Sequence, residues 1–317
     1  MDNLTGIKRA RVNGLGISSK QKRSIKLFLI AVPFLLYIFA FSYIPLFGWI
    51  YAFFDFSPFL GPNIFQQQFV GFAKFAQLWI GRNELFRVLR NTIVMSILSL
   101  ATTPLPVVLA ILLSEVKSKR FKKFIQTSTT FPNFISWIIV FGIAYSIFST
   151  NGLYAMLVQK LGGTPPAVGM LGNNNAVWIF QILMSIWKNL GWGAIIYVAA
   201  ISGIDQELYE AAKIDGANRF KCIRHVTVPG ISSTYLVLFL LAVSNILNNG
   251  FDQFFVFYNS MVANRIEVLD LYTYKVGIQL NDYDYSIAIG ITKSLISIAL
   301  LFIANNIAKR VRGASLI

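Results

Sequence analysis

The chain has 317 residues, of which 56% are hydrophobic and only 13% charged, whereas about 25% of the residues in a soluble domain carry a charge. This composition, without any linker-like break along the chain, predicts one integral membrane domain rather than two soluble ones. The formal net charge is +15, and the single cysteine, Cys222, excludes an internal disulfide framework.

Six apolar runs approach the length that a membrane-spanning helix requires, roughly 20 residues for about 30 Å of hydrocarbon. They lie near 27–53, 92–113, 134–148 with an extension back through 127–132, 177–201, 231–247 and 285–308. Prolines inside the runs, such as Pro33, Pro45, Pro104 and Pro106, predict kinks rather than breaks, because neighbouring helices can satisfy the freed carbonyl groups. We therefore expect an all-α integral membrane protein, with a six-span helical bundle over 27–308 between a basic segment 1–26 and a tail 309–317.

Lysine and arginine gather in alternate segments between the runs. The segment before the first run, the stretches 117–123 and 213–224, and the tail together hold 19 of the 28 basic residues. Because cytoplasmic loops carry an excess of Lys and Arg, we expect both termini in the cytoplasm of a multi-pass protein of the cell membrane. The basic surplus then indicates topology, not a nucleic-acid partner. The first run is too long for the core of a signal peptide, so we interpret it as an uncleaved anchor.

The loop 55–90, between the first two runs, is long enough to hold structure of its own. In its second half apolar residues recur at helical spacing, first Phe72, Phe75, Ala76 and Trp79, then Leu85, Phe86 and Leu89. Such stripes are typical of an interfacial helix lying on the membrane, and also of a scaffold segment packed on the bundle. Both interpretations remain open.

Polar side chains inside the runs are costly in lipid and therefore mark candidate sites. The fourth run and the end of the fifth contain Gln181, Ser185, Lys188, Asn189, Trp192 and Asn245. Hydrogen-bonding groups beside an aromatic ring suit a sugar, whose hydroxyls need partners and whose C–H face packs on aromatic carbon. The same groups can instead hold the helix against a partner helix. In the last run, Lys293 either snorkels to the interface or pairs with a partner subunit.

A polar segment, 205–229, lies between the two apolar runs four and five. Asp205 is a good N-cap, Leu208, Ala211, Ala212 and Asp215 follow at helical spacing, and Gly216 is placed to end the helix. A second short helix over 220–228 leads to Pro229 at the start of the next span. The resulting helix-turn-helix has a face of small residues, Ala211, Ala212, Gly216 and Ala217, with charge at Glu210, Asp215 and Arg219. Such a face predicts docking into a groove of another protein, although a solvated loop is the alternative.

The order Glu210-Ala211-Ala212, Asp215-Gly216-Ala217, Ile223 and Pro229 resembles the EAA loop of permease subunits in binding-protein-dependent ABC importers. Three further stretches, Phe131–Ile143, Ile186–Asp205 and Lys293–Arg310, are similar to the LplB-like branch of that family. That branch is associated with uptake of oligosaccharides released from complex polysaccharides. The resemblance covers nearly the whole chain after about Ser24.

The resemblance implies the type I importer architecture, in which the loop forms a coupling helix seated in a cleft of a cytoplasmic ATPase. Glu210 would pair with a basic group there, Ala211 and Ala212 would pack in the cleft, and Gly216 would let the chain turn. Implied partners are a second, homologous permease subunit, two ATPase subunits and an extracellular or periplasmic solute-binding protein. Asp252, Asp282 and Asp284 either meet that binding protein or form a solvated acidic loop.

No chemistry of its own is evident in the chain. The dipeptide Gly-Lys is absent, so it cannot build a Walker A phosphate cradle; we expect no cofactor here, with ATP and magnesium bound by the ATPase partners. His225 stands alone without ligands at metal spacing, and no catalytic arrangement is found. A stand-alone secondary transporter is an alternative, but it should carry intramembrane carboxylates, and none of the 13 acids falls inside a predicted span. A membrane enzyme or signalling anchor, the other alternative, should show a catalytic or receiver motif, and the sequence contains neither.

Overall fold

The computed structural model describes residues 19–61, 63–80, 82–165 and 167–312. Most of the basic segment 1–26 and part of the tail 309–317 lie outside these residues. Within them, six helical segments are long and apolar enough to cross a membrane: Arg23–Phe53, Asn83–Glu115, Trp137–Lys160, Val177–Ser202, Arg219–Ser244 and Tyr283–Arg310. The predicted all-α, six-span architecture is confirmed.

The chain divides into two compact units, Met1–Ile50 and Tyr51–Ile317. In the first, helix α1 (Ser19–Ile38) continues through Pro33 into a π turn, Phe39–Tyr43, and a 3-10 helix, Ile44–Phe53, begins next. Pro45 lacks the N–H that a regular α-helix needs at this point. The preceding residue, Ile44, donates to the carbonyl of Phe39 in a π-helical hydrogen bond. The kink predicted at Pro45 therefore takes the form of a change from α-helix to π turn and 3-10 helix.

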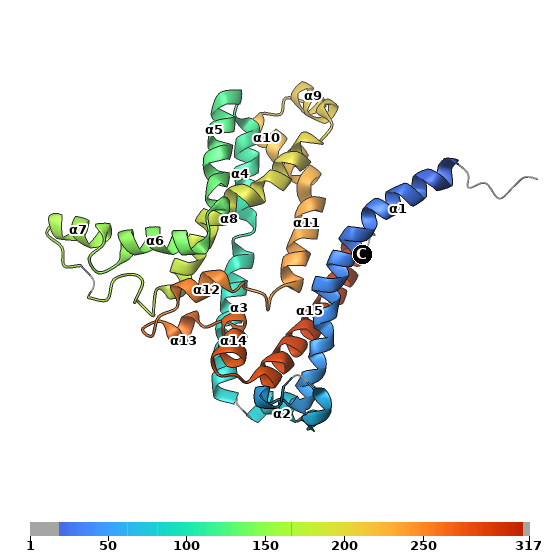
Figure 1. Cartoon of the computed structure of the whole chain (residues 1–317). Helices are drawn as coiled ribbons and strands as arrows, with labels where there is room; N and C mark the ends of the chain where they lie inside the picture. Colours follow the sequence, from blue (N-terminus) through green and yellow to red (C-terminus); the bar gives the residue numbers. More distant parts are fainter. Residues whose placement is uncertain (1–18, 62, 81, 166, 313–317) are drawn as a thin grey trace, which may run out of the picture. The chain divides into compact units, whose positions relative to one another are not determined.

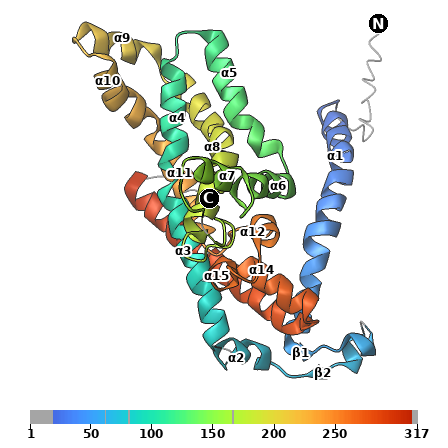
Figure 2. The same ribbon diagram turned by 90° about the vertical axis from the view of Figure 1, so that its left-hand side faces the viewer.

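The second unit begins with an antiparallel pair of short strands, β1 (Phe54–Asp55) and β2 (Gln68–Phe69), with Phe54 opposite Phe69. Figure 2 shows these strands beside α2 (Ala73–Ile80). Two 3-10 turns, Pro58–Leu60 and Ile64–Gln66, lie between the strands.

The second span consists of α3 (Arg82–Ala101) and α4 (Pro104–Glu115). Leu85 and Val88 of α3 are buried in a core cluster with Leu247 and Leu269, so the second apolar stripe of the 55–90 loop belongs to this spanning helix. Of the two interpretations, the interfacial helix is therefore wrong for the second half of 72–90, and the segment packed on the bundle is confirmed there. Helix α3 also ends in a two-residue turn before Pro104, which is a break where we expected a kink.

The third region is divided into four pieces: α5 (Lys119–Thr130), a 3-10 turn (Phe131–Phe134), α6 (Trp137–Phe148) and α7 (Leu153–Lys160). The predicted extension through 127–132 falls at the end of α5 and in the turn. Ser118 and Ser136 cap α5 and α6 by accepting hydrogen bonds from backbone N–H groups.

Helix α8 (Val177–Ser202) lies at the centre of the second unit and packs on α4 and α5. The approach to α5 requires glycine at position 191, because a Cβ there would lie 2.2 Å from the carbonyl atoms of Thr129. Val177 and Phe180 of α8 join Val140 of α6 in the largest core cluster.

Helices α9 (Gln206–Ile214), α10 (Arg219–Cys222) and α11 (Val228–Ser244) follow, with a π turn at Ile223–Thr227. After α11 come α12 (Asp252–Phe257), α13 (Ala263–Ile266), α14 (Leu269–Tyr274), a π turn (Lys275–Gln279) and α15 (Tyr283–Arg312). Figure 1 shows α9 and α10 at one end of α11 and α12 to α14 beyond the other.

A buried carboxylate fastens the α12–α14 region to α3. Glu267 is 2% exposed and accepts from Arg87 and Lys275, each at 2.6 Å. Arg87 also donates to the carbonyl of Ala263, and Asn91 donates to the carbonyl of Glu267. A carboxylate this deeply buried is tolerated because two cations neutralise it.

Candidate functional site

The first half of the 205–229 segment, through the turn at Gly216 and Ala217, has the local geometry that its sequence predicts. The Asp205 carboxylate accepts a hydrogen bond from the N–H of Glu207 at 3.0 Å, which confirms the N-cap. Gly216 adopts φ of +77°, a left-handed conformation that ends α9 and favours glycine. The N–H of Ala217 then donates to the carbonyl of Ala212 at 2.9 Å and closes the turn.

The second half of the segment differs from the prediction. Instead of a separate helix over 220–228, helical structure continues from Arg219 to Ser244 through α10, the π turn and α11. Pro229 lies in the first turn of α11, and the preceding Val228 donates to the carbonyl of Ile223 in π geometry. The missing N–H of Pro229 is thus accommodated by widening the helix rather than by ending it.

The exposed face of the segment is more apolar than expected. Glu210, Ala211, Asp215 and Gly216 are exposed, and Ala212, Ala217 and Ile223 are half-buried. Three large apolar side chains, Leu208, Ile214 and Phe220, are also exposed, and Ile214 is 87% exposed. We had named Leu208 only for its helical spacing and had not singled out Ile214 or Phe220. Leu208, Ala211 and Ile214 recur every three residues, which was the available sequence signal. Apolar side chains gathered on a protruding helix are typical of a protein-binding surface.

Two contacts hold α9 from behind. The hydroxyls of Tyr209 and Thr227 are 2.9 Å apart, which ties α9 to the π turn. Cys222 is buried beneath the turn, with its sulfur 4.0 Å from the carbonyl of Ala217. The exposed face formed by Leu208, Ala211, Ile214 and Phe220, here named the docking face after its predicted role, therefore lies on a braced helix-turn-helix. His225 is exposed, as expected of a surface residue.

Two of the predicted substrate-path residues on α8 have protein partners. Gln181 is 2% exposed, and its side-chain oxygen accepts from Gln253 of α12 at 2.8 Å. The Lys188 ammonium donates to three backbone carbonyls around the α5–α6 turn, those of Asn133 and Ile135 at 2.7 and 2.6 Å and that of Pro132 at 3.3 Å. Both side chains thus hold α8 to neighbouring elements.

Ser185 and Asn189 line a pocket of about 240 Å³ between α8 and the α3–α4 break. Its polar lining also includes Ser99, Thr102 and Thr103, which we did not identify from the sequence. Asn189 donates to Ser185 at 3.3 Å and accepts from Asn133 at 3.1 Å. Trp192 and Asn245 do not line this pocket. Trp192 is half exposed and lies edge-on to Phe134, and Asn245 is exposed and bonds within its own turn.

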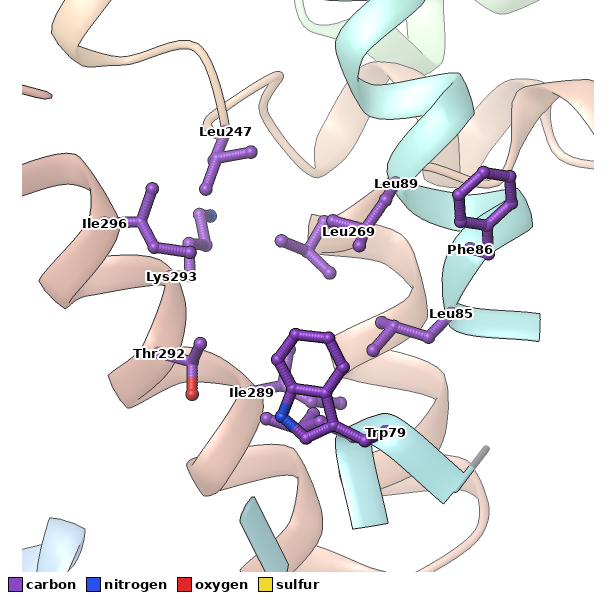
Figure 3. Close-up of a pocket in the computed structure, with 11 residues that line it drawn as sticks. Trp79, Leu85, Phe86, Leu89, Leu247, Leu269, Ile289, Thr292, Lys293 and Ile296 are labelled. Atoms are coloured by element: carbon purple, nitrogen blue, oxygen red, sulfur yellow. The ribbon is translucent and has the colours of Figure 1, made fainter. Parts of the chain in front are cut away.

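The prediction that Lys293 snorkels or pairs with a partner subunit is wrong, because its ammonium binds Asp270 of the same chain. Asp270 also accepts from the N–H groups of Asn249 and Gly250 at 3.0 and 3.1 Å. The Lys293 side chain lines an apolar pocket of about 410 Å³, between Leu247 and Ile296 in Figure 3. The pairing of Lys293 with Asp270, 23 residues away in the sequence, leaves no local sequence signal.

The acidic residues near the start of α15 also depart from expectation. Asp284 is 2% exposed and lies 3.0 Å from the Lys74 ammonium, so it is neither solvated nor free to meet a binding protein, and it lies at the beginning of the last span. Burial, together with the adjacent Asp284 carboxylate, raises the pKa of Asp282 to about 6. Asp252 is exposed, as predicted.

Six helices long and apolar enough to span a membrane, with an exposed helix-turn-helix between spans four and five, are the arrangement that the sequence predicts for the membrane component of a transporter. Residues 78–313 match the family described as binding-protein-dependent transport system inner membrane component. Since this match covers more than half of the chain, the protein belongs to that family of transport components.

Curated relatives and solved structures agree with this assignment. Protein LplB of Bacillus subtilis is 39% identical, covering 94% of this chain and 93% of the relative. The polygalacturonan/rhamnogalacturonan transport system permease protein YteP of the same organism is 37% identical over 90% of this chain and 88% of its own length. A chain in a crystal structure of a bacterial ABC transporter that imports the acidic polysaccharide alginate matches with a TM-score of 0.80 and 30% identity, over 92% of this chain and 97% of that one.

Proposed function

We propose that the chain is the permease subunit of an ATP-driven oligosaccharide importer, coupled through residues 205–229, here named the coupling segment, to a separate ATPase. The observation that carries this proposal is the exposed apolar face of Leu208, Ile214 and Phe220 beside Glu210 on a braced helix-turn-helix. Support comes from the relatives, whose names describe permease proteins of sugar transport systems.

The geometry suits a lever. Ala211 and Ala212 would pack in a cleft of the ATPase and Glu210 would pair with a basic group there, while Gly216 fixes the turn. The coupling segment continues without a break into span five, a helical run of 26 residues from Arg219 to Ser244, or about 39 Å at 1.5 Å per residue. Movement of the segment by closing ATPases would therefore tilt α11 as one body and carry α15, which packs on it.

The remaining subunits are part of the proposal. ATP and magnesium would be bound by two ATPase subunits, and a second, homologous permease subunit would complete the membrane pore. A binding protein would deliver the substrate from outside; one solved relative was crystallised as an alginate ABC transporter in complex with a pentasaccharide-bound periplasmic protein. The coupling segment would face the cytoplasm, together with both termini and the basic stretch 117–123.

The sugar would pass the 240 Å³ pocket formed by Ser185, Asn189 and the hydroxyls of the α3–α4 break. Hydroxyl and amide groups can exchange hydrogen bonds with sugar hydroxyls, and the half-exposed Trp192 offers an aromatic face nearby. The roles of Gln181, Lys188 and Asn245 in the path stay predictions, since the partners of the first two already explain their burial.

Transport by reconstituted vesicles tests the proposal. Glu210→Ala or Gly216→Pro should abolish ATP-driven oligosaccharide uptake while the subunit still inserts, whereas Gln159→Ala, at an exposed position of α7 outside the coupling segment, should transport normally. Normal uptake by both coupling-segment variants would remove the lever. For the path, Ser185→Ala and Asn189→Ala should change which oligosaccharides stimulate ATP hydrolysis; an unchanged substrate profile would count against this pocket.

A further inference from the structure

A polar pocket of about 550 Å³ lies between the coupling segment and the corner where α4 leads into α5. Lys117 and Lys122 line it from the corner, and Lys213 and Arg219 line it from the coupling segment. Figure 1 shows α4, α5, α9 and α10 at the same end of the second unit. The two walls of the pocket therefore belong to separate elements that meet across it.

The charges in this pocket are unbalanced. One carboxylate, Glu115, lines it, and this group lies 3.7 Å from the Arg219 guanidinium. Among the residues that the structure describes, the ammonium groups of Lys117, Lys122 and Lys213 form no ion pair. Three unpaired cations facing one concave space raise the local concentration of anions.

The pocket lies behind the docking face rather than on it. At 100° per residue, Gln206, Tyr209 and Lys213 share one side of α9, and all three line the pocket. Leu208 and Ala211 lie on the opposite side of the helix, and both are exposed. A protein bound at the docking face would therefore not cover this pocket, which lies on the other side of α9, toward the bundle.

We propose that this pocket binds a phosphate-bearing anion that bridges the α4–α5 corner and the coupling segment. A phosphate ester presents three terminal oxygens, enough for the ammonium groups of Lys117, Lys122 and Lys213, and lysine is a common phosphate-binding residue. The volume exceeds that of a bare phosphate ion, so an attached organic group fits. The phosphate can come from a lipid headgroup or from a soluble ester; both carry the same chemistry.

The consequence rests on the proposed function. The hydrogen bond between Tyr209 and Thr227 and the ion pair between Arg219 and Glu115 both hold the coupling segment from behind. An anion bound to Lys213 on one wall and Lys122 on the other would join the lever to the α4–α5 corner. The fraction of pockets that hold an anion would then determine how freely the coupling segment moves relative to the α4–α5 corner.

The test uses the full chain, with the subunits that copurify with it, in nanodiscs. Hydrogen exchange of the backbone amides in 205–219 is followed while glucose 6-phosphate is titrated into neutral phosphatidylcholine discs. A second arm uses discs containing phosphatidic acid and no soluble phosphate. We expect saturable slowing of exchange in at least one arm and none with glucose. The arm that responds identifies the source of the phosphate.

Matched variants make the outcome specific. Lys122→Gln/Lys213→Gln should need about tenfold more of the effective probe, the loss that removal of about 1.4 kcal/mol of binding produces. Lys119→Gln/Lys123→Gln, which removes two charges from α5 outside the pocket, should respond like the wild type. Lys117→Gln changes only the corner and should also weaken the response, which separates lost binding from a damaged α9.

Unchanged hydrogen exchange with both glucose 6-phosphate and phosphatidic acid would overturn the proposal. An equally weakened response in the Lys119→Gln/Lys123→Gln control would also overturn it, because the effect would then come from general surface charge. Exchange reports binding directly, without ATP or transport. Failure of this pocket is therefore distinguishable from failure of the coupling function, which the Glu210→Ala and Gly216→Pro variants test separately.

Discussion

Replacement of Ile214 by alanine should weaken association with the ATPase about thirtyfold, because this side chain is 87% exposed in the isolated chain and lies on the docking face. The substitution removes three carbon atoms, and each buried methylene contributes about 0.8 kcal/mol. If most of the side chain is covered in the complex, the loss is roughly 2 kcal/mol, which corresponds to a factor of about 30 in the dissociation constant.

The assay is a titration of the purified ATPase onto the full chain in nanodiscs, with Leu161→Ala as the control. Leu161 is also 87% exposed, but it follows α7 and lies outside the coupling segment, so its variant should bind like the wild type. Wild-type affinity of Ile214→Ala would refute the assignment of this face. A similar loss in both variants would refute the localisation of the effect.

Three further predictions concern the fold. Gly216→Ala should destabilise the coupling segment by about 1–2 kcal/mol through its φ of +77° alone, since no atom lies within 4 Å of the added Cβ; Gly216→Asn should cost less, and equal exchange protection of the two variants would contradict this. Gly191→Ala should lower the melting temperature sharply because its Cβ meets the Thr129 backbone, whereas Gly290→Ala, with open space around its Cβ, should not. The pKa of Asp282 is raised from 3.8 to about 6 in the folded chain, so the folded state binds this proton more tightly than the unfolded state. The free energy of unfolding, measured by hydrogen exchange in the 54–74 region, should therefore fall as pH rises from about 4 to 6. Asp282→Asn should flatten this pH profile, and an unchanged slope would contradict the role of Asp282.

The spans and the turn of the coupling segment could be predicted because their causes are local. Run length and apolar content set six helices, and Asp205 and Gly216 act on their own backbone neighbourhood. The break between α3 and α4 was underestimated because the sequence locates Pro104 but does not show whether neighbouring helices compensate for it. The Lys293–Asp270 and Lys74–Asp284 pairs depend on tertiary contacts between distant residues.

The candidate site shows the same division. Spacing located the small residues Ala211 and Ala212, but it did not show which apolar side chains the fold leaves exposed, so Ile214 and Phe220 were missed. On α8, helical spacing grouped Gln181 and Lys188 with Ser185, although Gln253 and the α5–α6 turn engage the first two. A stripe defined by period alone cannot distinguish side chains that face a path from those that face a neighbouring helix.

The three carbonyls held by Lys188 have a consequence for which parts of the chain can rearrange. Straightening of the α5–α6 turn would strand an ammonium ion and unpaired carbonyl groups in a region without bulk water, at a cost of several kcal/mol. The close contact at Gly191 fixes the same two elements a turn further along. The α5–α6 turn and α8 should therefore keep their relative position while the fifth and sixth spans move.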